Sequence, residues 1–311
     1  MKPKAIFIGI LLSIIFVFSS HTQQGDFPVL KGPYLGQEPP GITPEIFAPG
    51  IVCTDETQGC SVFLEGGRIF MYNVFREDES FLYELEMVSE HWTKPRLSSL
   101  TSDYYDGDFT LSPDGKTLFF SSRRPLKLDG TERKYSNIWL VKRTETGWGQ
   151  PSPLGAPINT EHHEAYPTLE KDGMFYFFAR DRGGYGKSDI FCSRLAEGVY
   201  KEPKNLGPAI NSDEHEWDPW IAPDGSFLVF CSTKSGGYGG DDIYVSFRER
   251  DGSWCNAINM GSRINSAKSE NRPYVTTDEK YFFYTSNKRG NRDIYWVDAK
   301  IIEELKPKEL K

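Results

Sequence analysis

Short apolar strand patterns return five times along the chain, and each return follows nearly the same order. A unit begins with an acidic or polar residue and continues with a short strand, a tight turn, an aromatic-rich strand and a strand close to Asp-Ile-Tyr. The units begin at Gln58, Asp106, Glu164, Glu216 and Glu270, which are separated by 48, 58, 52 and 54 residues. Helical periodicity is almost absent, so the pattern indicates an all-β chain. A period of about fifty residues with several strands per unit predicts a β-propeller.

The second unit shows how one blade is expected to form. Asp108–Ser112 is the first strand, Lys116–Ser122 the second and Asn137–Arg143 the third, with a Pro-Asp-Gly turn between the first two. In this turn Pro presets φ and Gly accepts a positive φ. The phrase WGQPSPLGAPINT closes the blade and recurs as YKEPKNLGPAINS and WCNAINMGSRINS. We also expect the Asp of each Asp-Ile-Tyr strand to contact the base that ends the second strand, as Asp242 with Lys234.

The two ends of the repeat array predict how the ring closes. After the fifth Asp-Ile-Tyr strand the chain continues only as IIEELKPKELK, whereas Ile42–Val52 before the first unit has the pattern of the missing strand. Completing the last blade with this strand would remove an exposed sheet edge. We therefore expect five four-stranded antiparallel blades, with the last one closed by an N-terminal strand. Six blades are the alternative, but Gln23–Ile42 is short for a whole blade.

The N-terminus has the pattern of a secretory leader. Lys2 and Lys4 precede the apolar run Ala5–Phe18, and a polar stretch follows. This pattern is typical of a signal peptide, and the run is short for a membrane anchor. The expected organisation is a signal peptide over residues 1–22, an extension over 23–41, one propeller domain over 42–302 and a C-terminal tail over 303–311. We expect an exported protein with no stable membrane span after cleavage.

Charge and cysteine content narrow the classes of partner. Without the leader lysines the chain would carry 34 basic and 44 acidic residues, a net charge of −10. Such a chain would be repelled by nucleic acids and anionic membranes, which leaves sugars, proteins and cations as partners. Of the five cysteines, Cys53 and Cys60 flank one loop and could form a disulfide after export. The other three lie in strand patterns, and no zinc-ligand spacing occurs.

The repeated phrases resemble a known family. SPDGKTLFFSS, NIW, KSDIF, GDDIY and the linking W-x-x-P-x-x-L-G-x-x-I-N are similar to TolB-type repeats, a WD-like class with a Pro-Asp-Gly turn. The resemblance covers roughly Ile42–Ala299, and LEGG in the first unit and TDEK in the fifth depart from it. It implies an exported bacterial protein, periplasmic or extracellular, that serves as a binding or scaffold module at the envelope. A few such relatives are peptidases or polysaccharide-degrading enzymes, but the chain has no G-x-S-x-G elbow.

The expected ligand site is the face where strand one begins, because loops on a rigid scaffold carry function. One acidic residue per unit is expected near the central channel there, and three histidines on this face break the repeat. A glycan, a peptide end or a cation would suit such a site, and clustered oxygens suit Ca²⁺; no motif for another cofactor is found. The alternative is that each repeated acid only pins its neighbouring blade. The candidate ligand-binding residues are Asp106, His162, His163, Glu164, His215, Glu216, Asp218 and Glu270.

Two other functions remain open from the sequence. Carboxylates facing each other across a channel could cleave sugars, as a glycoside hydrolase or lyase does, and the candidates would be Glu164, Glu216, Asp218 and Glu270. No nucleophile motif supports that function. The second is docking of an envelope protein on exposed aromatic residues, whose alternative role is packing between blades. The candidate anchors are Trp217, Trp220, Tyr185 and Tyr238.

Overall fold

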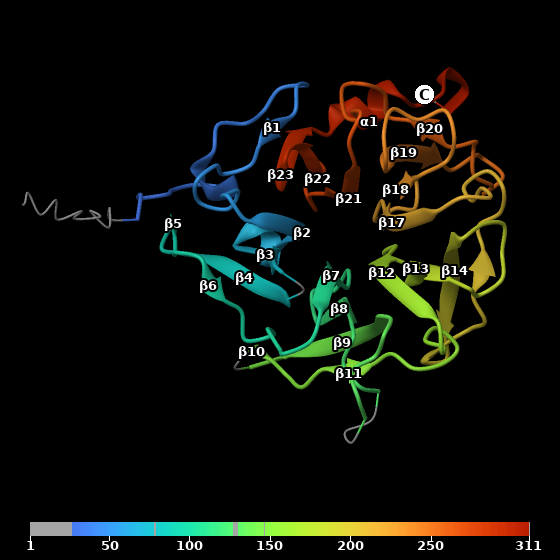
Figure 1. The fold of residues 1–311 in the computed structure, drawn as a ribbon, viewed down its shortest axis with the longest axis horizontal. Helices are drawn as coiled ribbons and strands as arrows, with labels where there is room; N and C mark the ends of the chain where they lie inside the picture. Colours follow the sequence, from blue (N-terminus) through green and yellow to red (C-terminus); the bar gives the residue numbers. More distant parts are fainter. Residues whose placement is uncertain (1–26, 78, 127–129, 146, 311) are drawn as a thin grey trace, which may run out of the picture.

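The five sequence units form five antiparallel sheets, arranged as blades around a central channel (Figure 1). This computed structural model describes residues 27–77, 79–126, 130–145 and 147–310. Within them the predicted all-β fold and the predicted number of blades are confirmed. The expected signal peptide, residues 1–22, lies outside the described residues. No helix in the described part of the chain is long and apolar enough to cross a membrane.

Each blade has long inner strands and short outer strands, numbered along the chain. Blade one contains β2 (Thr57–Leu64), β3 (Ile69–Arg76), β4 (Glu79–Val88), β5 (His91–Trp92) and β6 (Arg96–Leu97). Blade two contains β7 (Asp106–Leu111), β8 (Thr117–Ser122), β9 (Asn137–Thr144), β10 (Gly147–Trp148) and β11 (Ser152–Pro153). Blade three contains β12 (His163–Leu169), β13 (Met174–Arg180), β14 (Ser188–Ala196), β15 (Val199–Tyr200) and β16 (Lys204–Asn205). Blade four contains β17 (Glu216–Ile221), β18 (Phe227–Ser232), β19 (Asp242–Phe247) and β20 (Ile258–Asn259). Blade five contains β21 (Glu270–Val275), β22 (Tyr281–Arg289), β23 (Asn291–Asp298) and the N-terminal β1 (Glu45–Ile46).

The ring closes as predicted, through an N-terminal strand. β1 pairs antiparallel with β23, and the next residue, Phe47, donates its backbone N–H to the carbonyl of Ile294 at 2.9 Å. The Phe47 side chain is fully buried and makes edge-to-face contacts with Phe63 of blade one and Trp296 of blade five. Phe47 therefore seals the junction between the last blade and the first. The closure also removes the free edge that β23 would otherwise present.

Five hydrophobic clusters hold the ring together, one between each pair of neighbouring blades. The first strands β2, β7, β12, β17 and β21 contact one another around the channel, and Figure 1 shows them nearest its centre. Burial of aromatic side chains between sheets supplies most of the stability of such a ring, because each blade alone leaves two apolar faces exposed.

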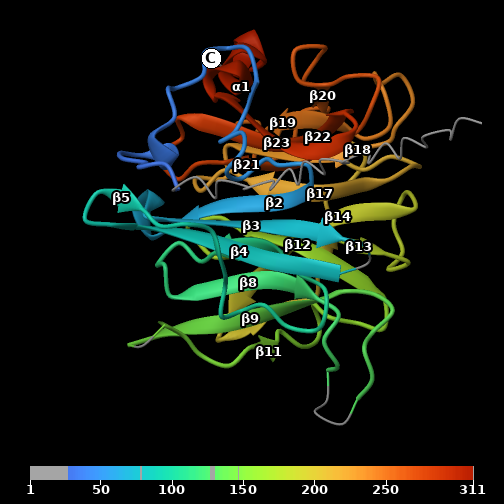
Figure 2. The same ribbon diagram turned by 60° about the vertical axis from the view of Figure 1, so that its left-hand side comes forward.

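Short segments at both ends pack against the ring (Figure 2). The 3-10 turn η1 (Tyr34–Gly36) buries Leu35 in the cluster between blades five and one. A second 3-10 turn, η2 (Glu65–Gly67), joins β2 to β3. After β23, helix α1 (Lys300–Glu304) buries two isoleucines against blades four and five, and the turn η3 (Lys308–Leu310) follows.

The two cysteines that were expected to pair are not joined in the structure. Both carry free thiols. The Cys53 sulfur accepts a hydrogen bond from the backbone N–H of Ile294 at 3.2 Å, in the cluster between blades five and one. The Cys60 thiol donates to Asn73 Oδ1 at 2.7 Å, in the cluster between blades one and two. The loop between them carries the chain from one blade junction to the next, so the two sulfur atoms are buried in different hydrophobic clusters.

The expected pin between Asp242 and Lys234 is replaced by another contact. The Asp242 carboxylate accepts hydrogen bonds from the backbone N–H of Tyr238, at 2.5 Å, and from Asn259 Nδ2, at 2.9 Å. Lys234 Nζ instead lies 4.0 Å from the ring centre of Tyr244. The Asp of this strand therefore caps the preceding Gly-Tyr-Gly loop, and the base packs on an aromatic face.

Candidate functional site

The linking phrases that follow blades two, three and four build a repeated clamp. Asn211 Oδ1 accepts the backbone N–H of Ile190 at 2.9 Å, while its Nδ2 donates to the carbonyl of the same residue at 3.0 Å. Asn265 makes the same pair of bonds to Ile243. The side-chain amide thus replaces a strand partner at the start of the third strand. The repeated Ile-Asn in the sequence is explained by this backbone pairing.

The repeated acids continue this scaffold. Glu216 is fully buried and accepts hydrogen bonds from Ser212, through its backbone N–H at 2.7 Å and its hydroxyl at 2.6 Å, and from Ser232 Oγ at 2.7 Å. Glu270 binds Ser266 and Ser286 in the same way. Each carboxylate therefore ties a residue of the incoming linker to the second strand. This is the scaffold role that the sequence left open as the alternative.

The acids of blades two and three are held similarly. Glu164 is fully buried and accepts Asn137 Nδ2 at 2.8 Å and the backbone N–H of Thr160 at 3.1 Å. Asp106 accepts Ser102 Oγ at 2.6 Å and pairs with Arg124 at 2.8 Å. The four acids that were expected at the channel thus lie inside the blade junctions, where their hydrogen bonds are made within the chain.

The residue two positions after each acid turns into the channel instead. Every first strand carries a β-bulge near its start, and in blades two to five one bulge residue has a positive φ. These residues are Asp108 (57°), Tyr166 (57°), Asp218 (51°) and Arg272 (57°). Such values are uncommon for residues other than glycine, and bulges re-aim side chains. Four blades therefore present three kinds of side chain: two aspartates, one tyrosine and one arginine.

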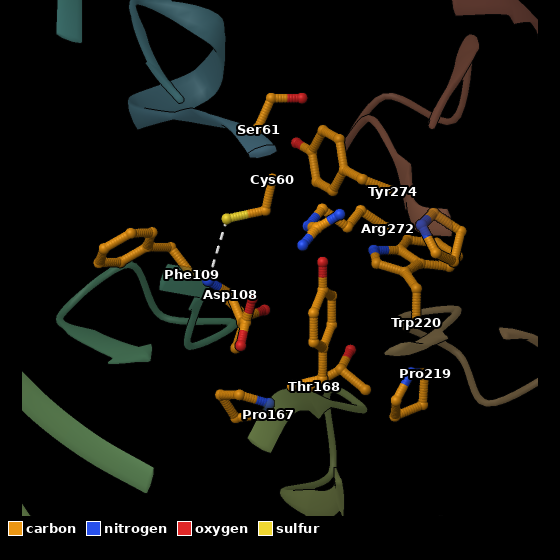
Figure 3. Close-up of a pocket in the computed structure, with 13 residues that line it drawn as sticks. Cys60, Ser61, Asp108, Phe109, Pro167, Thr168, Pro219, Trp220, Arg272 and Tyr274 are labelled. Atoms are coloured by element: carbon orange, nitrogen blue, oxygen red, sulfur yellow. Dashed lines mark hydrogen bonds between the residues drawn. The ribbon is translucent and has the colours of Figure 1, made fainter. Parts of the chain in front are cut away.

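These four residues line a cavity of about 310 Å³, the channel-mouth cavity, at the face where the first strands begin. Arg123 and Arg180, which follow or end the second strands of blades two and three, also line it, as does Asp241 from the loop before β19. Asp108, Tyr166 and Arg272 also line a smaller cavity further along the channel (Figure 3). Figure 3 shows Arg272 reaching toward the middle of the channel, with Asp108 on the other side of it.

Burial sets the protonation of the two aspartates. It raises the pKa of Asp218 to about 7, against the opposing charge of Arg272 and with reinforcement from Asp108. Burial also raises the pKa of Asp108, which a hydrogen bond from Ser121 opposes. The Asp108 carboxylate further accepts Tyr105 Oη at 3.2 Å. The cavity therefore holds two carboxylates that take up protons more readily than exposed ones.

The three predicted histidines separate into different environments. His163 lines the channel-mouth cavity, and burial lowers its pKa to about 4, so the ring is neutral at pH 7. His215 stacks on Trp217 with ring centres 4.8 Å apart, and its Nδ1 lies 3.0 Å from Ser188 Oγ. His162 is exposed on the surface. Of the predicted ligand residues, only His163 and Asp218 lie in the cavity.

The four aromatic residues proposed as docking anchors also differ. Trp217 lies between blades three and four, stacked on His215 and beneath the guanidinium of Arg180 at 5.4 Å. Trp220 packs on Phe227. Tyr185 and Tyr238 are about half exposed, at 54% and 50%, on the two Gly-Tyr-Gly loops. Within the described residues no three His, Cys, Asp or Glu side chains form a group that could hold a metal ion.

The sequence carried a signal for the residues that were missed. Aligned on their acids, the repeat units have Cys60, Asp108, Tyr166, Asp218 and Arg272 as their third letter. Residues that every blade needs stay the same, whereas this position holds Cys, Asp, Tyr or Arg and is the same only in the second and fourth units. The variation marked the channel, but the bulge that turns the side chains inward could not be read from the letters alone.

Known structures share this fold. A putative TolB from Agrobacterium tumefaciens is 19% identical, with a TM-score of 0.51 over 79% of this chain and 78% of that one. An α-L-arabinofuranosidase from Lactobacillus brevis is 13% identical, with a TM-score of 0.51 over 76% and 88%. The catalytic domain of a Coprinopsis cinerea GH62 α-L-arabinofuranosidase is 9% identical, with a TM-score of 0.50 over 83% and 97%. No protein-family model and no curated protein sequence matches the chain. At these identities the likeness establishes the TolB-like propeller fold, which binding proteins and enzymes share.

Proposed function

We propose that the chain is an exported TolB-like propeller that acts as a binding or scaffold module in the periplasm or at the cell envelope. Its ligand, a glycan or part of an envelope protein, contacts the channel-mouth cavity. One observation carries the proposal. The repeated acids make their hydrogen bonds within the scaffold, whereas the residues that line the cavity vary among the blades. A cavity with convergent polar groups on a rigid scaffold suits ligand binding.

The leader pattern supports export of the chain, and its net charge narrows the class of partner. Lys2 and Lys4 followed by the apolar run Ala5–Phe18 favour export. The excess of acidic over basic residues disfavours nucleic acid as the partner. A TolB-like fold supports a scaffold at the envelope, and fractionation of cells that express the full chain tests it. Recovery in the cytosolic fraction with the leader still attached would contradict export.

A carbohydrate-active enzyme is the second candidate, and one observation favours it. Asp108 and Asp218 lie in one asymmetric cavity of a fold that two arabinofuranosidases share. A glycosidase, however, needs one protonated and one ionised carboxylate, set apart by their environments. Burial raises the pKa of both Asp108 and Asp218. The two environments act in the same direction, so binding without turnover is the better supported function.

A ligand screen with paired variants tests this assignment. Thermal shifts of the mature chain are measured with Ca²⁺, EDTA, a glycan panel and peptidoglycan fragments, because a ligand stabilises according to its affinity and concentration. We expect a stabilising ligand whose effect is lost in Asp218→Asn and kept in Asp213→Asn, an exposed neighbour. Chromatography of the ligand after incubation should show no cleavage. A ligand whose effect survives Asp218→Asn and Tyr166→Phe alike would place the site elsewhere, and product formation would favour the enzyme.

A further inference from the structure

Three guanidinium groups line the channel mouth of this acidic protein, and a fourth lies near them. Arg123 and Arg180 line the cavity from blades two and three, and Arg272 lines it from blade five. Arg292, on β23, lies within electrostatic range of Arg272 and Asp218. Burial, followed by the charge of Arg272, lowers the pKa of Arg292 to about 10, which reflects positive charge crowded into one partly buried place.

Among the described residues, these arginines lack the carboxylate partner that four part-buried arginines elsewhere have. The part-buried Arg124, Arg133, Arg182 and Arg248 each have a carboxylate oxygen within 4.0 Å. Among the described residues, no carboxylate lies that close to Arg123 or to the part-buried Arg180, Arg272 and Arg292. The Nε atoms of these last three are also buried without a hydrogen-bond partner among the described residues. Part-buried guanidinium groups are costly unless an anion accompanies them.

The acids of the cavity only partly offset this charge. One oxygen of Asp218 accepts a hydrogen bond from the backbone N–H of Arg272 at 3.2 Å, and the Asp108 carboxylate accepts one from the hydroxyl of Tyr105. Asp241 accepts Asn271 Nδ2 at 3.2 Å. Three carboxylates thus face the three guanidinium groups of the lining and the nearby Arg292, and two of the three carboxylates take up protons readily. The mouth therefore has the charge to accept one further anionic group.

We propose that the channel mouth binds the carboxylate of a small hydroxylated acid, an acidic sugar unit, with Arg180 and Arg272 as the residues that recognise its charge. This inference rests on the proposed binding function and names the class of its ligand. A guanidinium group matches a carboxylate in two parallel hydrogen bonds. The singly charged carboxylate suits the mouth better than a doubly charged phosphate, because the mouth has the charge for only one further negative group. The same cavity is also lined by Asp241, Asn271 and Ser136. Their side chains can accept hydrogen bonds from sugar hydroxyl groups, and those of Asn271 and Ser136 can also donate to them.

Matched probes test the charge directly. Calorimetry compares D-glucuronate and D-galacturonate with D-glucose and D-galactose, which lack only the carboxylate. Glucose 6-phosphate and N-acetyl-alanyl-alanine supply a phosphate and a peptide carboxylate. We expect a uronate to bind about tenfold or more tightly than its neutral sugar, because a charged hydrogen bond contributes that much. Arg180→Gln and Arg272→Gln should each lose about that factor, whereas Arg194→Gln, at an exposed ion pair of blade three, should lose none.

Each other outcome overturns the inference in a recognisable way. Equal affinity for uronate and neutral sugar, or no binding of either uronate, removes the carboxylate as the recognised group. Tighter binding of the phosphate or of the dipeptide assigns the arginines to another ligand class. An equal loss in Arg194→Gln would mean nonspecific attraction. The proposed function would survive all of these if another ligand loses its thermal shift in Asp218→Asn, and circular dichroism of each variant confirms that it is folded.

Discussion

The Asp218 carboxylate accepts a hydrogen bond from the backbone N–H of Arg272 at 3.2 Å, across the junction between blades four and five. The same relation joins other blades, since the N–H of Asp108 donates to Cys60 Sγ at 3.0 Å and that of Tyr166 to Ser121 Oγ at 3.0 Å. The bulged residues Asp108, Tyr166 and Arg272 therefore each have their amide held by a side chain of the preceding blade. The positive φ at these positions is maintained by the ring itself, so the channel mouth is preorganised for its ligand.

The pKa of Asp218 predicts a pH dependence of stability. Burial raises this pKa from 3.8 to about 7, with Arg272 opposing and Asp108 and Asp241 reinforcing. The folded chain thus holds the proton more tightly than the unfolded chain, so the stabilisation is fully present below pH 3.8 and is lost as pH rises through about 7. In urea unfolding, stability should fall by up to about 1.4 kcal/mol per pH unit in this window because of Asp218. Asp218→Asn should lack that part of the slope, and an unchanged slope would contradict the burial of its charge.

The repeated acids should matter for stability rather than for binding. In Glu270→Gln the side chain keeps its shape but presents an amide N–H₂ to Ser266 and Ser286, which now donate to the carboxylate. Leaving a buried donor without its acceptor costs about 1–3 kcal/mol. Glu161→Gln, at an exposed residue, should change the free energy of unfolding by less than about 0.5 kcal/mol. Urea denaturation distinguishes the two, and similar small effects would refute the scaffold role.

Closure of the ring depends on Phe47, which touches both the first and the last blade. Its truncation in Phe47→Ala leaves a cavity among Phe63, Phe283 and Trp296. The expected loss is about 3–5 kcal/mol in the free energy of unfolding. Ile42→Ala, at a half-exposed position of the same segment, should cost less than about 1 kcal/mol. Equal losses for the two variants would mean that the N-terminal strand does not seal the ring.

The free thiols predict a labelling pattern. Burial raises the pKa of Cys53 and of Cys60 to about 12, and the thiolate is the reactive form. Iodoacetamide at neutral pH should leave both residues unmodified in the folded chain and label both after unfolding without reductant. Mass spectrometry of the digest reads this out. A linked Cys53–Cys60 peptide in an unreduced digest would restore the disulfide that the sequence suggested.

The fold could be predicted because its determinants are local and repeated. Strand alternation, the Pro-Asp-Gly turns and the displaced closing strand at Ile42–Val52 all stand in the sequence. The role of Glu216 was harder to see, although Ser212 precedes it by four residues and similar hydroxyl residues precede the other acids. That spacing predicts a local hydrogen bond from the hydroxyl group to the carboxylate, which leaves the carboxylate less free to bind a ligand.

The channel mouth could not be predicted because it depends on packing between distant blades. Two features decide whether Asp218 faces a core or a channel. One is the bulge in its strand, and the other is the hydrogen bond that its carboxylate accepts from the backbone N–H of Arg272, 54 residues further along the chain. Arg180 joins the mouth from the second strand of another blade. No local pattern relates these residues, and variation at one repeat position marked Asp218 and Arg272 but not Arg180.

The most direct test is to locate a bound ligand. A crystal structure of the mature chain with D-glucuronate, or with the strongest compound of the glycan panel, would show where the ligand lies. We predict density in the channel-mouth cavity, in contact with Arg180 or Arg272 and beside Asp218. Density on the Gly-Tyr-Gly loops at Tyr185 and Tyr238, with the mouth occupied only by solvent, would contradict the account.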